Sequence, residues 1–135
     1  MPRFSSHSLA VLKTVDPSLR EICMRAIKEY DFSVLCGHRN EHDQNEAYDA
    51  GRSRLKWPNS KHNSYPSLAV DIAPYPILWS DPVRFVELSK IIKRIASEIM
   101  IPIQWGGSWV KFCDMPHYEL TDWSLVDGKR EGKAL

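Results

Sequence analysis

Hydrophobic residues recur at spacings of three and four in two stretches of the chain, which is the period of an amphipathic helix. One stretch covers residues 19–30 and follows an Asp-Pro pair at 16–17; the other covers residues 85–99 and follows an Asp-Pro pair at 81–82. Aspartate can cap the first turn of a helix and proline fits its first position, so both pairs favour a helix start. The pattern predicts two amphipathic helices.

Three shorter apolar segments, FSVLC, LAVDIA and IPIQW, predict strands, and a strand pair is expected around residues 109–112 and 117–120. The polar run between Asn40, a candidate cap, and Gly51, a candidate stop, predicts a third helix. Residues 52–67 carry Pro, Asn and Ser and are expected to form a long loop, which is often a functional segment. Helices packed on a small mixed or antiparallel sheet give an α+β fold.

The composition fits one small domain without a strong overall charge. The chain has 135 residues, of which 43% are hydrophobic, and 18 basic against 17 acidic side chains leave a formal charge of +1. No global field therefore steers it toward nucleic acid or anionic membranes. We expect a single domain over residues 1–135, with a flexible tail from about 127 to 135, and a monomer by default.

Further sequence features concern the compartment in which the chain folds. No apolar run approaches the roughly 20 residues that span a bilayer, and the N-terminus lacks a signal-peptide core, so we expect no membrane insertion and synthesis in the cytoplasm. Three cysteines without CxxC spacing, Cys23, Cys36 and Cys113, favour reduced and mostly buried thiols over a disulfide framework.

Three side chains from different segments are candidates for metal binding. His62 lies in the long loop, Asp71 in a predicted strand, and His117 at the start of another. Three nitrogen and oxygen ligands with a fourth position left for water is the arrangement of a catalytic zinc site. The alternative is a solvated loop histidine and an aspartate that caps or pairs with a neighbour. Spacing by itself leaves both interpretations open.

Two segments, SKHNSYPSLAVDIAPYP and WGGSWVKFCDMPHYEL, carry Ser-x-His, Ala-x-Asp and Asp-x-x-His-x-Glu in that order. Together they resemble the M15 zinc peptidases, the D-Ala-D-Ala carboxypeptidases and L-alanyl-D-glutamate endopeptidases that cut peptidoglycan stem peptides, and above all the bacteriophage endolysin branch. The resemblance runs from about Gly37 to Leu120. One departure is a longer interval between His62 and Asp71, with Pro66-Ser67 where many members have a glycine.

The resemblance implies a hedgehog/DD-peptidase-like zinc site with Zn²⁺ held by His62, Asp71 and His117. It also implies that Asp114 is the catalytic acid/base and that Arg39 contacts the substrate carbonyl or carboxylate. A carboxylate beside zinc can take the proton of an attacking water, and a fixed guanidinium can stabilise an oxyanion. The residues alone leave simpler alternatives, a turn aspartate and a surface arginine.

Five further residues are candidates for substrate binding or for support of the ligands: Gln44, Ser60, Trp105, Trp109 and Glu119. Gln44 follows the arginine segment and would orient substrate. Glu119 shares a strand face with His117 and would accept a hydrogen bond from its imidazole, with Ser60 in a similar role. Ordinary surface hydrogen bonding is the alternative for both. The two tryptophans would wall the cleft or belong to the core.

The resemblance implies zinc-dependent hydrolysis of stem peptides, as an L-alanyl-D-glutamate endopeptidase in phage lysis that reaches the wall after release from the cell. Three alternatives stay open. A D-Ala-D-Ala carboxypeptidase or a non-catalytic, zinc-containing wall-binding module would share the site. A nucleic-acid or anion-binding module is suggested by the basic residues around Trp57, although the neutral total charge argues against a nucleic-acid partner. These basic residues are Arg52, Arg54, Lys56 and Lys61.

Overall fold

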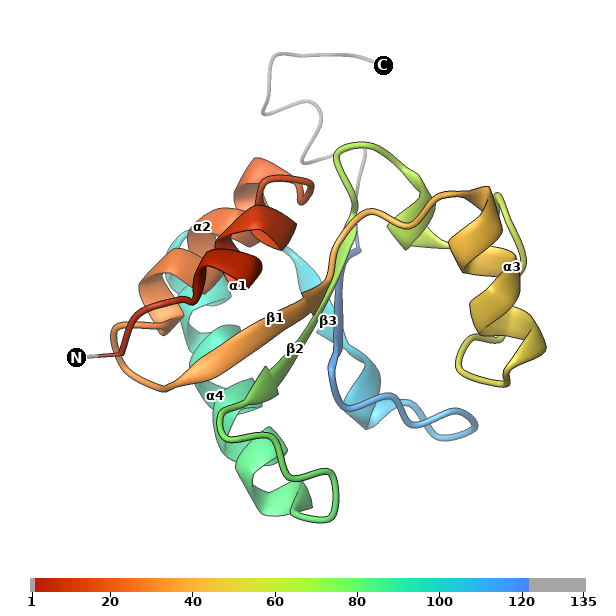
Figure 1. Cartoon of the computed structure of the whole chain (residues 1–135). Helices are drawn as coiled ribbons and strands as arrows, with labels where there is room; N and C mark the ends of the chain where they lie inside the picture. The colour runs from red at the N-terminus through yellow and green to blue at the C-terminus, as the bar shows by residue number, and fades with distance from the viewer. Residues whose placement is uncertain (1, 122–135) are drawn as a thin grey trace.

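A four-stranded antiparallel sheet lies at the centre of the fold (Figure 1). The structure is a computed structural model that describes residues 2–121, so the tail expected from about 127 lies outside the described residues. The strand order is β1-β2-β4-β3. The strands are β1 Phe32–Cys36, β2 Ala69–Pro74, β3 Ile103–Trp105 and β4 His117–Leu120. The predicted α+β class is confirmed, and the sheet is antiparallel throughout.

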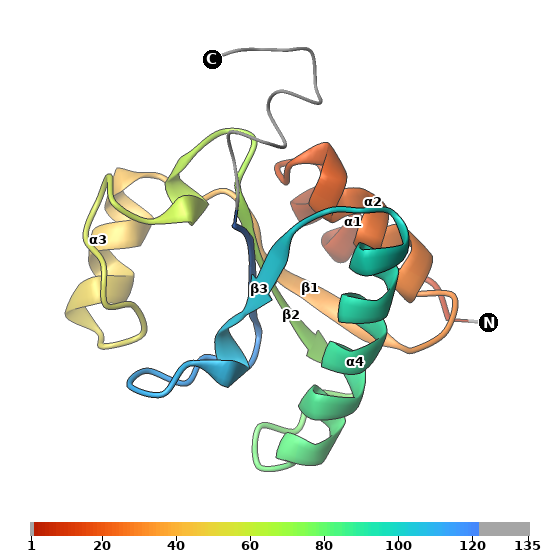
Figure 2. The same ribbon diagram turned by 180° about the vertical axis from the view of Figure 1, so that it is seen from behind.

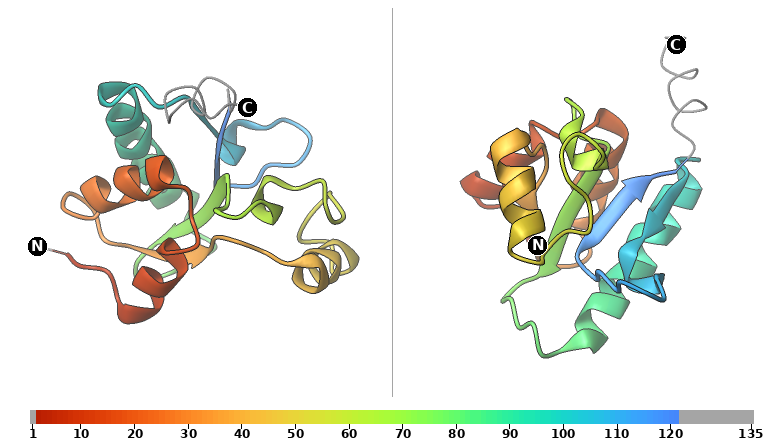
Figure 3. Two further views of the ribbon diagram at one scale, coloured as in Figure 1. Left: turned by 90° about the horizontal axis from the view of Figure 1, so that it is seen from above. Right: turned by 90° about the vertical axis from the view of Figure 1, so that its right-hand side faces the viewer.

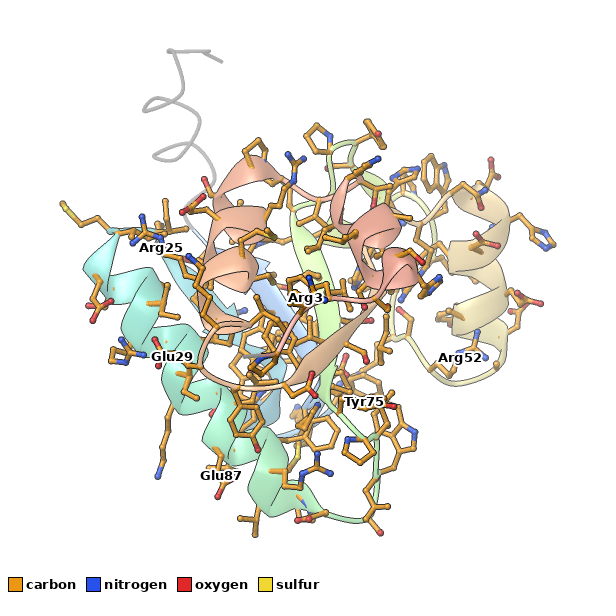
Figure 4. All side chains as sticks on the ribbon, turned by 60° about the vertical axis from the view of Figure 1, so that its left-hand side comes forward. Arg3, Arg25, Glu29, Arg52, Tyr75 and Glu87 are labelled. Carbon is orange, nitrogen blue, oxygen red and sulfur yellow. The ribbon has the colours of Figure 1, made fainter. Side chains whose placement is uncertain are left out.

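One face of this sheet is covered by helices (Figure 2). They are α1 Ser6–Leu12, α2 Pro17–Ala26 and α4 Pro82–Glu98. Helix α1 packs on β1, α4 packs on β2 and β3, and α2 packs on α4. Tyr30, just after α2, donates a hydrogen bond at 3.0 Å to Glu87 of α4, a residue labelled in Figure 4. Helix α3, Glu41–Asp49, lies with the loop after it on the other side of the sheet (Figure 3).

Local capping explains where α2 and α3 begin, whereas Asp81, the expected cap of α4, makes no side-chain capping hydrogen bond. Asp16 accepts a hydrogen bond from the backbone of Ser18, and α2 starts at Pro17 as predicted. Asn40 caps α3 in the same way, and Gly51 follows that helix with a φ of +79°, a conformation that favours glycine. Helix α1 was not predicted. It is a short helix whose first turn is capped by Ser5, in a segment with little apolar periodicity.

The sheet separates the hydrophobic core from a polar face. Tyr118 pairs with Val70 and Trp105 across the strands, and these three side chains are buried on the helix-covered face. Full burial of a side chain such as Leu or Ile contributes about 1.5–3 kcal/mol. Because side chains alternate along a strand, the neighbours of Tyr118, which are His117 and Glu119, point to the opposite face. That second face carries the chemistry described below.

Residues 109–112 do not form the predicted strand. Strand β4 pairs instead with β3, with Ile103 opposite Leu120. The chain after Trp105 forms a short 3₁₀ helix, Gly106–Ser108, and then an irregular loop in which Val110 is 97% exposed. The apolar residues that suggested a strand therefore face away from the core.

The long loop over residues 52–67 contains a 3₁₀ helix, η1, over Lys61–Asn63. Ser67, the last residue of the long loop, is hydrogen-bonded to the segment between α1 and α2. The Asp16 amide donates to the Ser67 carbonyl at 2.9 Å, and the Ser67 amide donates to the Thr14 carbonyl at 2.8 Å. The longer interval before Asp71 is thus fixed against the helical layer. Within the described residues, no helix is long and apolar enough to cross a membrane.

Candidate active site and metal centre

Three predicted metal-binding side chains converge on the polar face of the sheet. The register of β2 and β4 places Asp71 directly opposite His117. Asp71 Oδ1 lies 3.1 Å from His117 Nδ1 and 3.3 Å from His62 Nε2. The two imidazole rings are 5.1 Å apart between centroids. Side chains from η1, β2 and β4 therefore form one cluster of nitrogen and oxygen donors.

His62 is held in one orientation by backbone contacts. Its Nδ1 lies 2.7 Å from the carbonyl oxygen of Gly37, and its amide donates to Ser60 Oγ at 3.1 Å. Ser60 and Asn63 cap η1 reciprocally, so Ser60 positions the histidine. Since Nδ1 must donate its proton to the carbonyl, the lone pair of the neutral ring is on Nε2. This buried Nε2 has no hydrogen-bond partner among the described residues, which fits a metal ligand.

His117 is oriented by Glu119 from the same strand. Glu119 Oε1 lies 2.7 Å from His117 Nε2, so this nitrogen carries the proton and Nδ1 faces Asp71. The other carboxylate oxygen lies 3.2 Å from Lys61 Nζ and accepts a hydrogen bond from Gln104. Glu119 thus occupies the place expected for the acceptor behind a ligand imidazole.

The charges of the cluster shift the pKa values of its members. Burial would raise the pKa of Asp71, but the positive charge of protonated His62, and next the hydrogen bonds that the two imidazoles donate to Asp71 only when they are protonated, hold it well below its usual range. Burial would lower the pKa of His62, yet the charge and hydrogen bond of Asp71 raise it to about 10. At neutral pH the cluster without metal therefore holds a proton on His62, which a metal ion has to displace.

Cys36 is a further donor beside this cluster, and its ligand atom lies within 4.8 Å of those of His62 and Asp71. Its Sγ faces His62 Nδ1 at 3.9 Å, the nitrogen already engaged by Gly37. A metal ion at His62 Nε2 therefore has Asp71 and His117, rather than Cys36, on its side of the ring. Two imidazoles and a carboxylate suit zinc in a catalytic site.

The expectation of buried thiols is wrong for two of the three cysteines. Simple alternation along β1 would put Cys36 on the buried face of Phe32 and Val34, but a bulge between Val34 and Cys36 shifts the register so that Cys36 pairs with Asp71. One extra residue turns the following side chain to the other face of the sheet. Cys36 is consequently half-buried beside the site, and Cys113 is exposed.

Arg39 contacts the cluster and is fixed by Gln44. Its Nη2 lies 3.5 Å from Asp71 Oδ2, and its Nη1 donates to Gln44 Oε1 at 3.0 Å. Gln44 is fully buried, accepts a second hydrogen bond from Asn63, and donates to Ser53 Oγ and to the Leu55 carbonyl. Its amide is saturated by these partners. Gln44 therefore holds the Arg39 guanidinium in place and has no hydrogen-bonding atom left over.

Asp114 lies in the loop before β4, close to the cluster. The Asp114 amide donates to the Gly106 carbonyl at 2.9 Å, and the Asp114 carbonyl accepts a hydrogen bond from the His117 amide at 3.1 Å. A Cβ on Gly106 would clash with the Asp114 carbonyl oxygen, so this close approach requires glycine. Burial, and next the charge of Asp71, raise the pKa of the Asp114 carboxyl, which favours proton exchange nearer neutral pH.

A cavity of about 680 Å³ opens over the cluster. Among the predicted site residues, it is lined by Arg39, Ser60, His62, Asp71, Trp109, Asp114, His117 and Glu119. The ring of Trp109 lies 5.2 Å from that of His117. Trp105 is not in the lining: it is 8% exposed, it stacks on Tyr118, and its Nε1 donates to the Met115 carbonyl. It belongs to the core, the alternative that the sequence left open.

Sequence analysis missed several residues of the cavity wall. Trp79, Lys111 and Phe112 all line it. Trp79 follows β2 and stacks on Phe85 of α4, and the other two lie in the loop where a strand was predicted. The basic residues near Trp57 in the sequence indicated part of this wall, because Arg52, Arg54 and Lys61 line the cavity.

Comparisons with known proteins agree with this geometry. A family model described as phage L-alanyl-D-glutamate peptidase matches residues 1–129. The chain is 31% identical over 112 residues to the L-alanyl-D-glutamate peptidase of Escherichia phage T5, covering 79% of this chain and 81% of that protein. The crystal structure of the Serratia marcescens L-Ala D-Glu endopeptidase ChiX matches with a TM-score of 0.77 and 31% identity, over 88% of this chain and 90% of that one. The chain therefore belongs to the phage L-alanyl-D-glutamate peptidase family.

Proposed function

We propose that the protein is a zinc-dependent endopeptidase that hydrolyses the L-alanyl-D-glutamate bond of peptidoglycan stem peptides during phage lysis. The observation that carries the proposal is the convergence of His62 Nε2 and His117 Nδ1 on Asp71 Oδ1 in the wall of a cavity that also contains Asp114. The bond is the one in the names of the relatives. The family, and not the cavity alone, supports that choice over a D-Ala-D-Ala bond.

Zinc would be held by His62, Asp71 and His117. The fixed tautomers support this assignment, because each imidazole donates one nitrogen proton to a protein oxygen and presents the other nitrogen to Asp71. Zinc bound in this way supplies a Lewis acid that activates water near neutral pH.

Asp114 is the group proposed to move the proton. Its carboxylate accepts a proton from the water that attacks the scissile carbonyl carbon, and it then donates that proton to the departing amine nitrogen. The raised pKa of Asp114 suits both steps, because the carboxyl can hold the proton between them. Gly106 fixes the backbone of this residue from behind.

Arg39 is proposed to stabilise the negative charge that develops on the carbonyl oxygen. Gln44 holds the guanidinium at 3.0 Å, so the positive charge is in place before the reaction. Preorganised charge of this kind is often the largest contribution to catalysis. A binding module for wall peptides would need neither a proton carrier nor an oriented cation beside the metal.

Mass spectrometry of the fragments released from purified peptidoglycan tests the proposal. The zinc-loaded protein is expected to release peptides that carry a new free amino group on D-glutamate, and a chelator is expected to abolish them. An Asp114→Asn variant with its zinc retained serves as the matched inactive control. Released D-alanine would reassign the bond, and the absence of any chelator-sensitive product from several wall types would refute the hydrolase.

A further inference from the structure

Two loops meet at the mouth of the cavity. The first follows α3 and contains Arg52 and Arg54; the second follows the 3₁₀ helix Gly106–Ser108 and contains Lys111 and Phe112. They approach each other beside α3 in Figure 1, and the Arg54 guanidinium lies 5.8 Å from the centre of the Phe112 ring. Arg52 lies at the end of α3 away from the N-terminal helices (Figure 4). Cationic side chains from both walls therefore face one opening.

The charges in the cavity do not balance. The lining has five lysine or arginine side chains and three carboxylates. Two of these cations are already paired, Arg39 with Asp71 and Lys61 with Glu119. The remaining cations are Arg52, Arg54 and Lys111, and within residues 2–121 none of them forms an ion pair. The whole chain carries a formal charge of only +1, so this is a local excess of positive charge.

The chemistry of the proposed substrate accounts for such an excess. A D-glutamate whose amino group is in the scissile amide has two carboxyl groups, and only one of them can continue the peptide. The other is a free carboxylate unless the wall amidates it. The residue directly after the cleaved bond thus presents a negative charge close to the metal centre. Arginine binds carboxylates through a planar fork, and lysine adds a mobile point charge.

We propose that Arg54 and Lys111 bind the free carboxylate of the D-glutamate residue, with Arg52 adding to the field, and that the enzyme thereby prefers free over amidated stem peptides. This inference rests on the proposed function. Exposed single ion pairs contribute little, but here two cations from opposite walls act on one ligand inside a cavity. The Phe112 ring also limits the freedom of the Arg54 side chain.

The chain supplies a matched control in the same loop. Lys56 is also basic and exposed, but its Nζ lies 5.0 Å from the centre of the Tyr48 ring. Lys56 is not among the residues that line the cavity. Its removal changes the net charge of the protein as much as the removal of Lys111 does. It therefore separates a general charge effect from binding in the cavity.

The test compares two synthetic stem peptides that differ only in this group, one with the carboxylate and one with the carboxamide. The zinc-loaded wild type and its Arg54→Gln, Lys111→Gln and Lys56→Gln variants are assayed for kcat and KM on each peptide at low and high salt. We expect the wild type to prefer the carboxylate peptide. We expect Arg54→Gln and Lys111→Gln each to lose about fivefold to tenfold in kcat/KM on it, chiefly through KM.

The same two variants should change little on the carboxamide peptide, and Lys56→Gln should match the wild type on both. The preference of the wild type should also shrink as salt rises, because the charges are near the surface. Equal wild-type rates on both peptides, or equal losses of the variants on both, would overturn the inference and leave the proposed function intact. A wild type that cuts neither peptide would refute the proposed function, and the inference would fall with it.

Discussion

Replacing Glu119 with alanine is expected to weaken metal binding while the fold is kept. The carboxylate accepts the proton of His117 Nε2 at 2.7 Å and so keeps Nδ1 available toward Asp71. Loss of such a partner typically costs about 10–100-fold in metal affinity, which corresponds to about 1.4–2.8 kcal/mol. The perturbation therefore acts on the metal through the ring that it orients.

Two contacts narrow this range. The Glu119 side chain is 13% exposed, so its hydrogen bond to His117 is partly shielded from water. The loss of zinc affinity on its removal should therefore exceed the lower limit of about tenfold. Lys61 keeps a partner when Glu119 is removed, because its Nζ also donates to the Leu120 carbonyl. The variant therefore leaves no buried charge without a partner. We expect it to lose about 30-fold in zinc affinity, or about 2 kcal/mol. Glu119→Gln retains an acceptor oxygen and should lose less than about tenfold.

Competition with a chromogenic chelator measures the zinc affinity of each variant, and thermal unfolding of the metal-free proteins reports on the fold. Glu98→Ala is the matched control, since this carboxylate pairs with Arg94 on the surface of α4. It should leave zinc affinity unchanged. A folded Glu119→Ala protein that binds zinc as tightly as the wild type would refute the reasoning that the carboxylate sets the state of His117.

Three other variants or conditions test different parts of the site. Asp114→Asn should lower kcat by about 10²–10⁴-fold while zinc affinity stays within a few-fold, as measured by peptide cleavage and metal titration; retained activity would exclude Asp114 as the proton carrier. Gly106→Ala places a Cβ against the Asp114 backbone and should lower kcat more than zinc affinity; a kcat equal to that of the wild type would show that the loop before β4 can shift to accommodate the Cβ without moving Asp114. Zinc binding at pH 7 should release at least about one proton, because Asp71 raises the pKa of His62 to about 10 in the metal-free site. Affinity should consequently rise with pH between about 6 and 10, and calorimetry in buffers of different ionisation enthalpy measures the release; no dependence on the buffer would contradict a protonated His62.

Local sequence signals were enough for the parts of the fold that depend on neighbouring residues. The helices after Asp16 and Asn40 follow from periodicity and capping, although α2 ends at Ala26 and not at Tyr30. The helix after Asp81 follows from periodicity and its first-turn proline, because Asp81 makes no side-chain capping hydrogen bond. Helix α1 was not predicted, because its seven residues carry little hydrophobic periodicity. The failed strand at 109–112 has strand-like residues, but β3 already occupies the edge of β4 to which they would pair.

The site depended on information that single segments do not carry. Periodicity cannot show that Asp71 stands opposite His117, because that register is a property of two strands distant in sequence. The resemblance to a known family supplied the grouping, and the structure brings those three donors together. Cys36 is an opposite case: simple alternation along β1 would put it in the core, but a bulge turns its side chain to the face of the sheet that carries the site. Gln44 likewise took a supporting role that only its buried partners reveal.

Crystallography of the zinc-loaded protein with anomalous diffraction at the zinc edge tests the central claim most directly. The account predicts one main anomalous peak, bonded to His62 Nε2, Asp71 and His117 Nδ1 and open to the cavity, with Cys36 outside bonding distance. A peak bonded to Cys36 Sγ in place of His117, or a main peak at the exposed donors of α3, His42, Asp43 and Glu46, would contradict it.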